Sequence, residues 1–362
     1  KEEIELKYAY LIAFTFYGLS MILPSTALVN SWPAGVSNVK LVLQAISIAL
    51  LLSCVVKGTF RPKRIIATFF LACVVASSAL VGGSFGLVWL VLFILAAHGV
   101  SLRQVASVNA IVNAIVVVAL AILTMTGIID SIVFYRDGSL RYAMGFLQPN
   151  SFGRSLAEIS IGMFVCRFGR FKFTDYALQI ALGASCYLIS GSRTSAVVIA
   201  LVLFFMVFTE GRKSGVQPTF RAFRVAAVTF FSLVTLSLYL AFAYNPNNPV
   251  MEWLNSILTD RIFYMNYYVS TYPPMPFGQD LEGALTVGIF GLVNQLILDN
   301  SWIYSLEMFG IIPTILLVLV TFLLIRDASL YKRSTPFPYL LILSAVTAFT
   351  EATAFNPFHS YY

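Results

Sequence analysis

The sequence predicts an all-α polytopic membrane protein with about 11–12 transmembrane helices. Three observations support this fold class. Hydrophobic residues make up 59% of the 362 residues and charged residues only 11%, whereas soluble domains carry about 25% charged residues. The apolar residues gather in runs near the roughly 20 residues that a helix needs to cross a bilayer. The basic residues fall mainly in short loops between these runs.

Eleven apolar segments are expected to be helical. They lie at residues 7–23, 38–56, 65–82, 85–99, 107–129, 150–167, 175–190, 194–210, 224–244, 301–325 and 337–355. With a cytoplasmic N-terminus, every basic loop falls on the cytoplasmic side, as the positive-inside rule requires. A twelfth helix is expected if the chain continues past Tyr362. The whole of 1–362 is therefore expected to be a single integral membrane domain.

One external segment, 245–300, is much longer than the other loops. Within it, residues 284–298 are apolar but too short to span without reversing the following loops. These residues are therefore expected to form a re-entrant or interfacial helix. Long loops in compact proteins usually serve a function, so this segment is expected to contribute to the site.

Four arginines break the charge pattern because they fall on or near the outer face. They are Arg141, Arg154, Arg193 and Arg261. Cations near hydrocarbon are costly and are retained mostly for function. We therefore expect an anionic ligand in or beside the membrane. The net charge of +7 does not require a nucleic-acid partner, since most of it lies in loops that would face anionic lipid.

The first two arginines frame the start of a helix. Asn150 is expected to cap that helix after Pro149, and Arg154 and Glu158 share its face with Asn150. A helix N-terminus beside arginines suits an anion. The alternative is that Arg154 and Glu158 merely neutralise each other inside the bundle.

The third arginine follows a break between two apolar helices. Gly191 ends the first helix, Ser192 or Thr194 can cap the second, and Arg193 lies at its positive end. The alternative, an arginine whose charge reaches out to the membrane surface, explains one such residue well but four poorly.

Two further groups of residues lie on the long loop and at its end. Arg261 follows Asp260 in a tyrosine-rich stretch that includes Tyr264, and tyrosines beside arginines suit a sugar ligand. The alternative for this group is a solvated ion pair. In the other group, Asp299 is expected at the N-cap of the tenth helix. Asn300, Tyr304 and Glu307 share one stripe of that helix, and His359 adds a polar group near the chain end. A capped helix with an interfacial aromatic residue would explain Asp299 and Trp302 but not Glu307.

Motifs for cofactors are missing from the sequence. There is no phosphate-binding loop, no HExxH and no cysteine–histidine cluster with metal spacing, so neither a cofactor nor a metal is expected. The four cysteines all lie in or beside apolar runs and are expected to be core residues.

Three ordered segments resemble the O-antigen polymerase and O-antigen ligase superfamily. They are Arg141 to Arg154 with its G-x-x-x-P-N-x-x-G core, the S-G-S-R-T-S turn at 190–195, and D-N-S-W-I-Y-S-L-E-M-F-G at 299–310. The resemblance covers roughly residues 100–325. It implies a GT-C glycosyltransferase of the bacterial inner membrane that uses undecaprenyl-pyrophosphate-linked oligosaccharides as donor and acceptor. It also implies contact with membrane lipid, a repeat-unit flippase and a chain-length regulator.

The resemblance implies roles for particular residues. Outward-facing arginines of such enzymes hold the pyrophosphate. The residues expected to bind substrate are Arg141, Asn150, Arg154, Ser192, Arg193, Arg261, Tyr264, Asn300 and Tyr304. The candidate general bases are Asp299, Glu307, Glu158 and His359. The ligases carry a histidine where this chain has Asp299-Asn300, which favours the polymerase branch.

We therefore expect metal-independent, inverting polymerisation of repeat units on the extracytoplasmic face. Two alternatives stay open. One is a ligase that transfers finished glycan to a lipid or protein acceptor. The other is a flippase or transporter of lipid-linked oligosaccharide, for which broken helices or inverted repeats are typical; neither is evident in the sequence.

Overall fold

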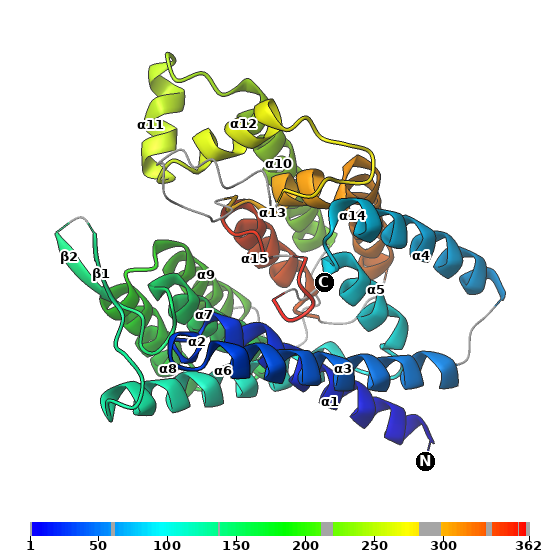
Figure 1. Cartoon of the computed structure of the whole chain (residues 1–362), viewed down its shortest axis with the longest axis horizontal. Helices are drawn as coiled ribbons and strands as arrows, with labels where there is room; N and C mark the ends of the chain where they lie inside the picture. Colours follow the sequence, from blue (N-terminus) through cyan, green and yellow to red (C-terminus); the bar gives the residue numbers. More distant parts are fainter. Residues whose placement is uncertain are drawn as a thin grey trace. The chain divides into compact units, whose positions relative to one another are not determined.

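The protein is a helical multi-pass membrane protein (Figure 1). The computed structural model describes residues 2–58, 62–136, 138–210, 220–281, 298–330, 335–353 and 355–359. Among these, six helices are long and apolar enough to cross a membrane: Ile4–Ser25, Pro33–Lys57, Leu102–Met125, Arg193–Glu210, Arg221–Ala243 and Ile311–Ala328. Shorter apolar helices cover Phe69–Gly82, Gly86–Ala96 and Phe337–Thr350. The GT-C-like arrangement stays a prediction.

The chain divides into two compact units, which we describe separately. Unit 1 comprises residues 1–58 and 92–216, and unit 2 comprises residues 59–91 and 217–360. The expectation of a single membrane domain stays a prediction. The expected re-entrant or interfacial helix at 284–298 lies, except for its last residue, outside the described residues.

Unit 1 holds the N-terminal helices and the middle of the chain. Its helices are α1 (Glu2–Ile22), α2 (Leu28–Ser31), α3 (Pro33–Lys57), α6 (Leu102–Met125), α7 (Pro149–Arg167), α8 (Phe173–Ser185) and α9 (Arg193–Glu210). It also contains the 3-10 turn η1 (Leu23–Ser25), the π-helix η2 (Cys186–Ser190) and the last residues of α5 (Gly86–Ala96).

Helices α6 and α7 form the centre of unit 1, since α6 packs against α1 and α7, and α7 packs against α9. They approach closely at Gly162, where a Cβ would lie 2.6 Å from Cβ of Ala110 and 2.7 Å from the carbonyl oxygen of Ala106. Small residues let membrane helices come this near. The contact fixes how the polar residues of α7 face α6.

A β-hairpin in unit 1 was not expected in an all-α chain. Strands β1 (Val133–Arg136) and β2 (Ser139–Tyr142) pair antiparallel between α6 and α7. The sequence carries Asp137-Gly138 between the strands, and Asp-Gly between apolar stretches is among the strongest short-range hairpin signals. The Asp137-Gly138 pair therefore indicates this hairpin in the sequence.

Unit 2 holds α4 (Pro62–Gly82), the first residues of α5, and the C-terminal helices. These helices are α10 (Phe220–Ala243), α11 (Pro249–Ile257), α12 (Arg261–Thr271), α13 (Ser301–Tyr304), α14 (Ile311–Leu330) and α15 (Phe337–Thr350), with the π-helix η4 (Ser305–Phe309) between α13 and α14. Helix α10 packs against α12, α13, α14 and α15. Its C-terminal end and α12 share a buried apolar cluster.

The tenth expected helix is broken, which corrects the expectation of a continuous segment at 301–325. Gly310 has a φ of +100° and separates η4 from α14. The first free amides of α14 are paired by a loop, because Ile311 N donates to Met275 O and Ile312 N donates to Pro276 O, both at 3.0 Å. The other ten expected segments are helical with ends within a few residues of those expected.

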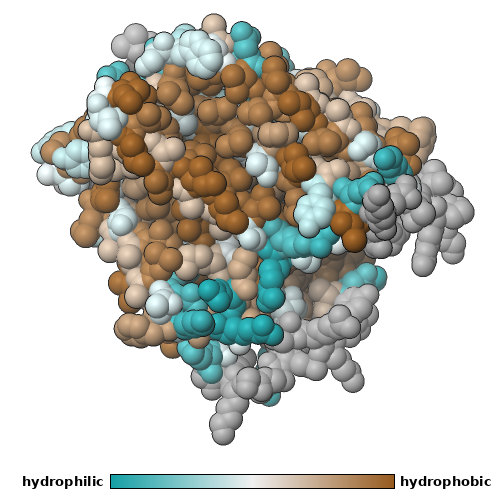
Figure 2. Space-filling view, turned by 90° about the horizontal axis from the view of Figure 1, so that it is seen from below, coloured by the Kyte–Doolittle hydropathy of each residue, from teal (hydrophilic) through white to brown (hydrophobic). Residues whose placement is uncertain are grey.

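Apolar side chains cover much of the exposed surface. Figure 2 shows broad apolar areas on the face turned to the viewer. Exposed apolar residues lie on the long helices α3, α6, α9, α10 and α14. A monomer in water rarely exposes so much contiguous apolar surface, whereas helices in contact with lipid do.

Candidate functional site

Arg141 ties the hairpin to the helices of unit 1. It is the buried residue of β2, with 8% of its surface exposed. Its Nε donates to the carbonyl oxygen of Ser190 at 2.8 Å, and its Nη2 donates to Oδ1 of Asn150 at 2.7 Å. The guanidinium therefore joins the end of η2 to the start of α7.

Gly191 makes room for this arginine. It ends η2 in the left-handed conformation, with a φ of +58°. A Cβ at this position would lie 2.9 Å from Nε of Arg141 and 3.1 Å from its Cγ. A side chain would thus be strained by its backbone and would also push Arg141 away.

The start of α7 differs from the expectation in one respect. Gln148 is the N-cap and Pro149 the first helical residue, so Asn150 lies inside the helix. Its side chain accepts from Arg141 instead of capping. The prediction of Asn150 as N-cap was wrong, because Pro149, with its fixed φ, is the first helical residue and moves the cap two residues back to Gln148.

The N-terminal ends of α7 and α9 meet. A Cβ on Gly153 of α7 would lie 2.6 Å from Cβ of Ser192, the residue before α9. Ser192 is buried, and its hydroxyl donates to Oγ of Ser195 at 3.0 Å. Each helix N-terminus carries a partial positive charge and unpaired amides, so two such ends side by side favour an anion.

Two more arginines belong to these helix ends. Arg154 lies one turn into α7, is half-buried, and has no hydrogen bond or ion pair with any described residue. Arg193 is the first residue of α9 and is exposed. Unit 1 thus brings Arg141, Arg154 and Arg193 to one pair of helix ends.

Glu158 lies deeper in the same unit. It is buried, and its Oε2 accepts from Nδ2 of Asn109 on α6 at 3.3 Å. The alternative in which Glu158 neutralises Arg154 is not realised. Asn109 was missed from the sequence, because nothing in its own helix indicates which neighbouring helix it faces.

In unit 2, Arg261 is held between two carboxylates. Its Nε lies 3.4 Å from Oδ2 of Asp299 and its Nη2 lies 3.9 Å from Oε1 of Glu351. Unlike Arg154, it is already paired with acidic groups. A substrate anion would have to displace them, so binding of substrate by Arg261 stays a prediction.

Asn300, and not Asp299, caps α13, which corrects the expected cap. Oδ1 of Asn300 accepts from the amides of Trp302 and Ile303, both at 3.1 Å. Its Nδ2 donates to Oγ of Ser237 at 2.9 Å and to the carbonyl oxygen of Phe349 at 3.0 Å. The side chain is wholly buried and used for structure, so its expected contact with substrate stays a prediction.

Glu307 is wholly buried in η4, ahead of the apolar span Ile311–Ala328. Its Oε2 accepts from Nε2 of Gln279 at 2.8 Å. Its Oε1 has no partner among the described residues. Burial raises the pKa of this carboxyl to about 7. Gln279 was missed from the sequence, since only the folded loop brings it to the break in the helix.

The remaining expected site residues also lie in unit 2. Tyr264 is buried in the apolar cluster beside α10 and does not offer an open face for a sugar. Tyr304 is half-buried, with its ring edge-on to Phe309. His359 is half-buried, with its ring against Phe358. Their functional roles stay predictions.

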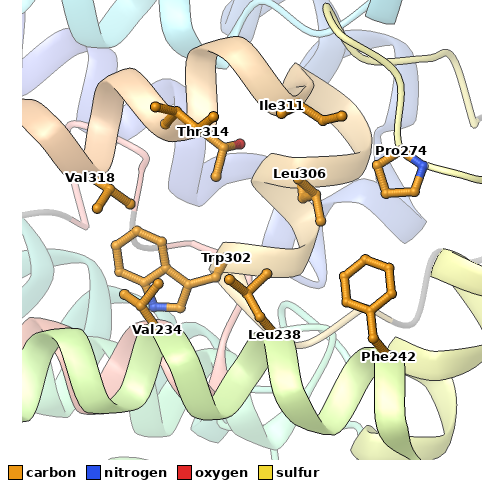
Figure 3. A pocket seen from close by; sticks show the side chains of 10 residues that line it. Val234, Leu238, Phe242, Pro274, Trp302, Leu306, Ile311, Thr314 and Val318 are labelled. Atoms are coloured by element: carbon orange, nitrogen blue, oxygen red, sulfur yellow. The ribbon is translucent and has the colours of Figure 1, made fainter.

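An apolar cavity of about 530 Å³ opens between α10 and α14 in unit 2. Figure 3 shows Val234, Leu238 and Phe242 of α10 facing Trp302 and Leu306 across it. The hydroxyl of Thr314, which also lines it, is hydrogen-bonded to Oγ of Ser305 at 2.8 Å. The cavity is suited to an aliphatic chain.

Fold and site define a helical membrane protein with a cationic site at two adjoining helix ends. Comparison with protein-family models, with curated proteins and with solved structures found no match.

Proposed function

We propose that the protein is a glycosyltransferase of the bacterial plasma membrane that polymerises undecaprenyl-pyrophosphate-linked oligosaccharide repeat units on the extracytoplasmic face. The observation that carries the proposal is the meeting of the α7 and α9 N-termini beside Arg141, Arg154 and Arg193. This arrangement concentrates positive charge, and among the residues that the structure describes Arg154 has no acidic partner. The resemblance of the three sequence segments to the polymerase branch agrees with it.

In the proposed reaction, a hydroxyl oxygen of the acceptor unit attacks C1 of the donor glycan. The bond from C1 to the pyrophosphate oxygen breaks, and the anomeric centre inverts. Arginines and helix amides stabilise the negative charge that develops on the leaving pyrophosphate. The hydroxyl proton passes to a base, for which Asp299, Glu307, Glu158 and His359 stay candidates.

The test uses the purified protein in nanodiscs with the matching undecaprenyl-pyrophosphate oligosaccharide. A product ladder spaced by one repeat unit is the expected result, and Arg141→Ala and Arg154→Ala should lower its rate at least about 100-fold, the scale on which oxyanion donors act. Arg326→Ala is the matched control, because Arg326 is exposed and pairs only weakly with the adjacent Asp327. Equal rates in all three variants would refute the role of the site. Transfer to a separate acceptor without a ladder would identify a ligase.

A second candidate function is transport of the lipid-linked oligosaccharide. The break at Gly310, with the buried Glu307 just before it, favours this candidate because broken helices are typical of transporters. It overturns the expectation that the chain lacks such a helix. The assay follows a fluorescent lipid-linked oligosaccharide in vesicles that contain the protein. Its movement from one leaflet of the vesicle membrane to the other, without formation of a glycosidic product, would support transport over polymerisation.

A further inference from the structure

The β1–β2 hairpin has two chemically different faces. Val133 lies opposite Tyr142, and Tyr135 lies opposite Leu140. Cross-strand partners point to the same side of a hairpin, and successive residues alternate between sides. These four residues therefore share one face, which we call the apolar face. Arg141 lies on the other.

On the opposite face Arg141 is the buried residue, and it attaches the hairpin to unit 1, whereas Phe134 on this face is 41% exposed. Phe134 pairs with Arg141, and Arg136 pairs with Ser139. Through Arg141 this face reaches Ser190 and Asn150. An isolated two-stranded hairpin is at best marginally stable in water, so the arginine contacts on this face are one part of what holds it.

The apolar face is only partly covered by the described residues. All four of its side chains are exposed, and Tyr135 most of all, at 74%. None of them carries a charge. A hairpin that leaves tyrosine, valine and leucine side by side on its outer face requires a covering surface.

The helix that precedes the hairpin carries an exposed apolar stripe. Helix α6 is a membrane span, and its exposed apolar residues recur every three or four positions: Ile111, Ile115, Val118, Ile122 and Met125. This spacing places them on one side of the helix. Ile128, between α6 and β1, is exposed as well. A short segment that includes the buried Ile129 and the exposed Asp130 then leads into β1. The hairpin thus lies close in sequence to the end of a helix whose exposed apolar stripe is suited to lipid.

We propose that the apolar face lies in the boundary between the headgroups and acyl chains of the bilayer. Tyrosines are enriched at this depth because the ring is apolar and the hydroxyl is polar. A glycan is a poorer match, because Val133 and Leu140 offer no hydrogen bond and the face has no carboxylate or amide. The proposal does not rest on the proposed function.

The consequence is that Arg141, on the other face of the same two strands, is presented at the level of lipid headgroups. This consequence rests on the proposed function: the anionic group that meets Arg141 at this depth is carried by a membrane lipid. The hairpin thereby sets the depth of Arg141 in the membrane.

The test places the photo-crosslinker p-benzoyl-L-phenylalanine at Tyr135 in the full chain, in nanodiscs of phosphatidylethanolamine and phosphatidylglycerol. Val118→p-benzoyl-L-phenylalanine, on the lipid-facing stripe, is the positive control, and Ser139→p-benzoyl-L-phenylalanine, on the opposite face, is the matched control. The expected result is phospholipid adducts at Tyr135 with a yield close to that at Val118 and several-fold above that at Ser139, read by mass spectrometry.

Equal lipid yields at Tyr135 and Ser139 would overturn the proposal. So would cross-links from Tyr135 to a second protein copy or to added lipid-linked glycan in place of phospholipid, while Val118 still labels lipid. Leu140→p-benzoyl-L-phenylalanine lies on the same face and replaces the Tyr135 variant if that variant does not fold.

Discussion

Replacement of Glu307 with glutamine should make the stability of the protein less dependent on pH. In the native protein one carboxyl oxygen accepts from Gln279 and the other has no partner among the described residues. The glutamine keeps the size of the side chain and the hydrogen bond from Gln279, and it removes the titration. The variant therefore isolates the cost of burying a charge at this break in the helix.

The magnitude follows from the pKa of the carboxyl. Burial raises the pKa of Glu307 from 4.5 to about 7. At 1.36 kcal/mol per pKa unit, ionising the buried group costs about 3 kcal/mol of folding stability. Because the folded-state pKa exceeds the unfolded value, this cost is absent below pH 4.5, grows as the pH rises toward 7, and is complete above it.

Glutamine resembles the protonated acid in its hydrogen bonding. Its amide nitrogen takes the place of the unpartnered oxygen, and neither this amide nor the O–H of the protonated acid has an acceptor among the described residues, which costs about 1–3 kcal/mol in both. Glu307→Gln should therefore be close in stability to the native protein at pH 5. At pH 8 it should be more stable, since only the native protein then buries a charge.

The measurement is the midpoint of thermal unfolding in detergent, followed by tryptophan fluorescence between pH 5 and 8. The difference between variant and native midpoints should change by roughly 5 °C across this range, given about 2 °C per kcal/mol for larger domains. Asp327→Asn is the control, because Asp327 is exposed and should leave the pH dependence intact. Parallel curves for Glu307→Gln and the native protein would refute the reasoning.

Two further predictions use matched pairs of residues. Gly191→Ala should lower the proposed polymerising activity at least about tenfold, because its Cβ would displace Arg141. Gly169→Ala has a similar φ of +73° but no described atom within 4 Å of its Cβ, and should show only the backbone strain of about 1–2 kcal/mol. Product ladders and unfolding midpoints of the two variants separate these effects, and equal activity would contradict the first prediction. Asn300→Ala should cost about 3 kcal/mol, since a buried cap and two further hydrogen bonds are lost. Asn248→Ala removes only an exposed cap and should lower the free energy of unfolding by about 1 kcal/mol. Similar midpoints of thermal unfolding for the Asn300 and Asn248 variants would show that the buried hydrogen bonds of Asn300 contribute little.

The helices could be predicted because contact with lipid and burial in the core both require long apolar segments. Such segments can be recognised in the sequence alone. The break at Gly310 was not predictable in this way. Apolar residues flank it on both sides, and a single glycine is tolerated in many helices. The break depends on the carbonyl oxygens of Met275 and Pro276, which pair the amides of α14 from a distant loop.

The candidate site could also be predicted only in part from the sequence. The arginines near helix starts could be found from charge placement, and Gly191 from its position between two apolar runs. Their partners could not, because Arg141 lies 49 residues from Ser190 in sequence. Asparagine is a residue type that often caps helices, but the side chain of Asn150 accepts a hydrogen bond from Arg141 and does not cap α7. Local propensity identified the residues, and tertiary packing decided their roles.

The bonds made by Asn300 and Ser301 impose an order on biosynthesis. Asn300 donates to the carbonyl oxygen of Phe349, and Ser301 donates to that of Glu351. Both acceptors emerge from the ribosome about 50 residues after their donors. The segment at 300–309 can therefore acquire its final hydrogen bonds only once α15 has been made and inserted, so the last described helix of the chain completes the interior of unit 2.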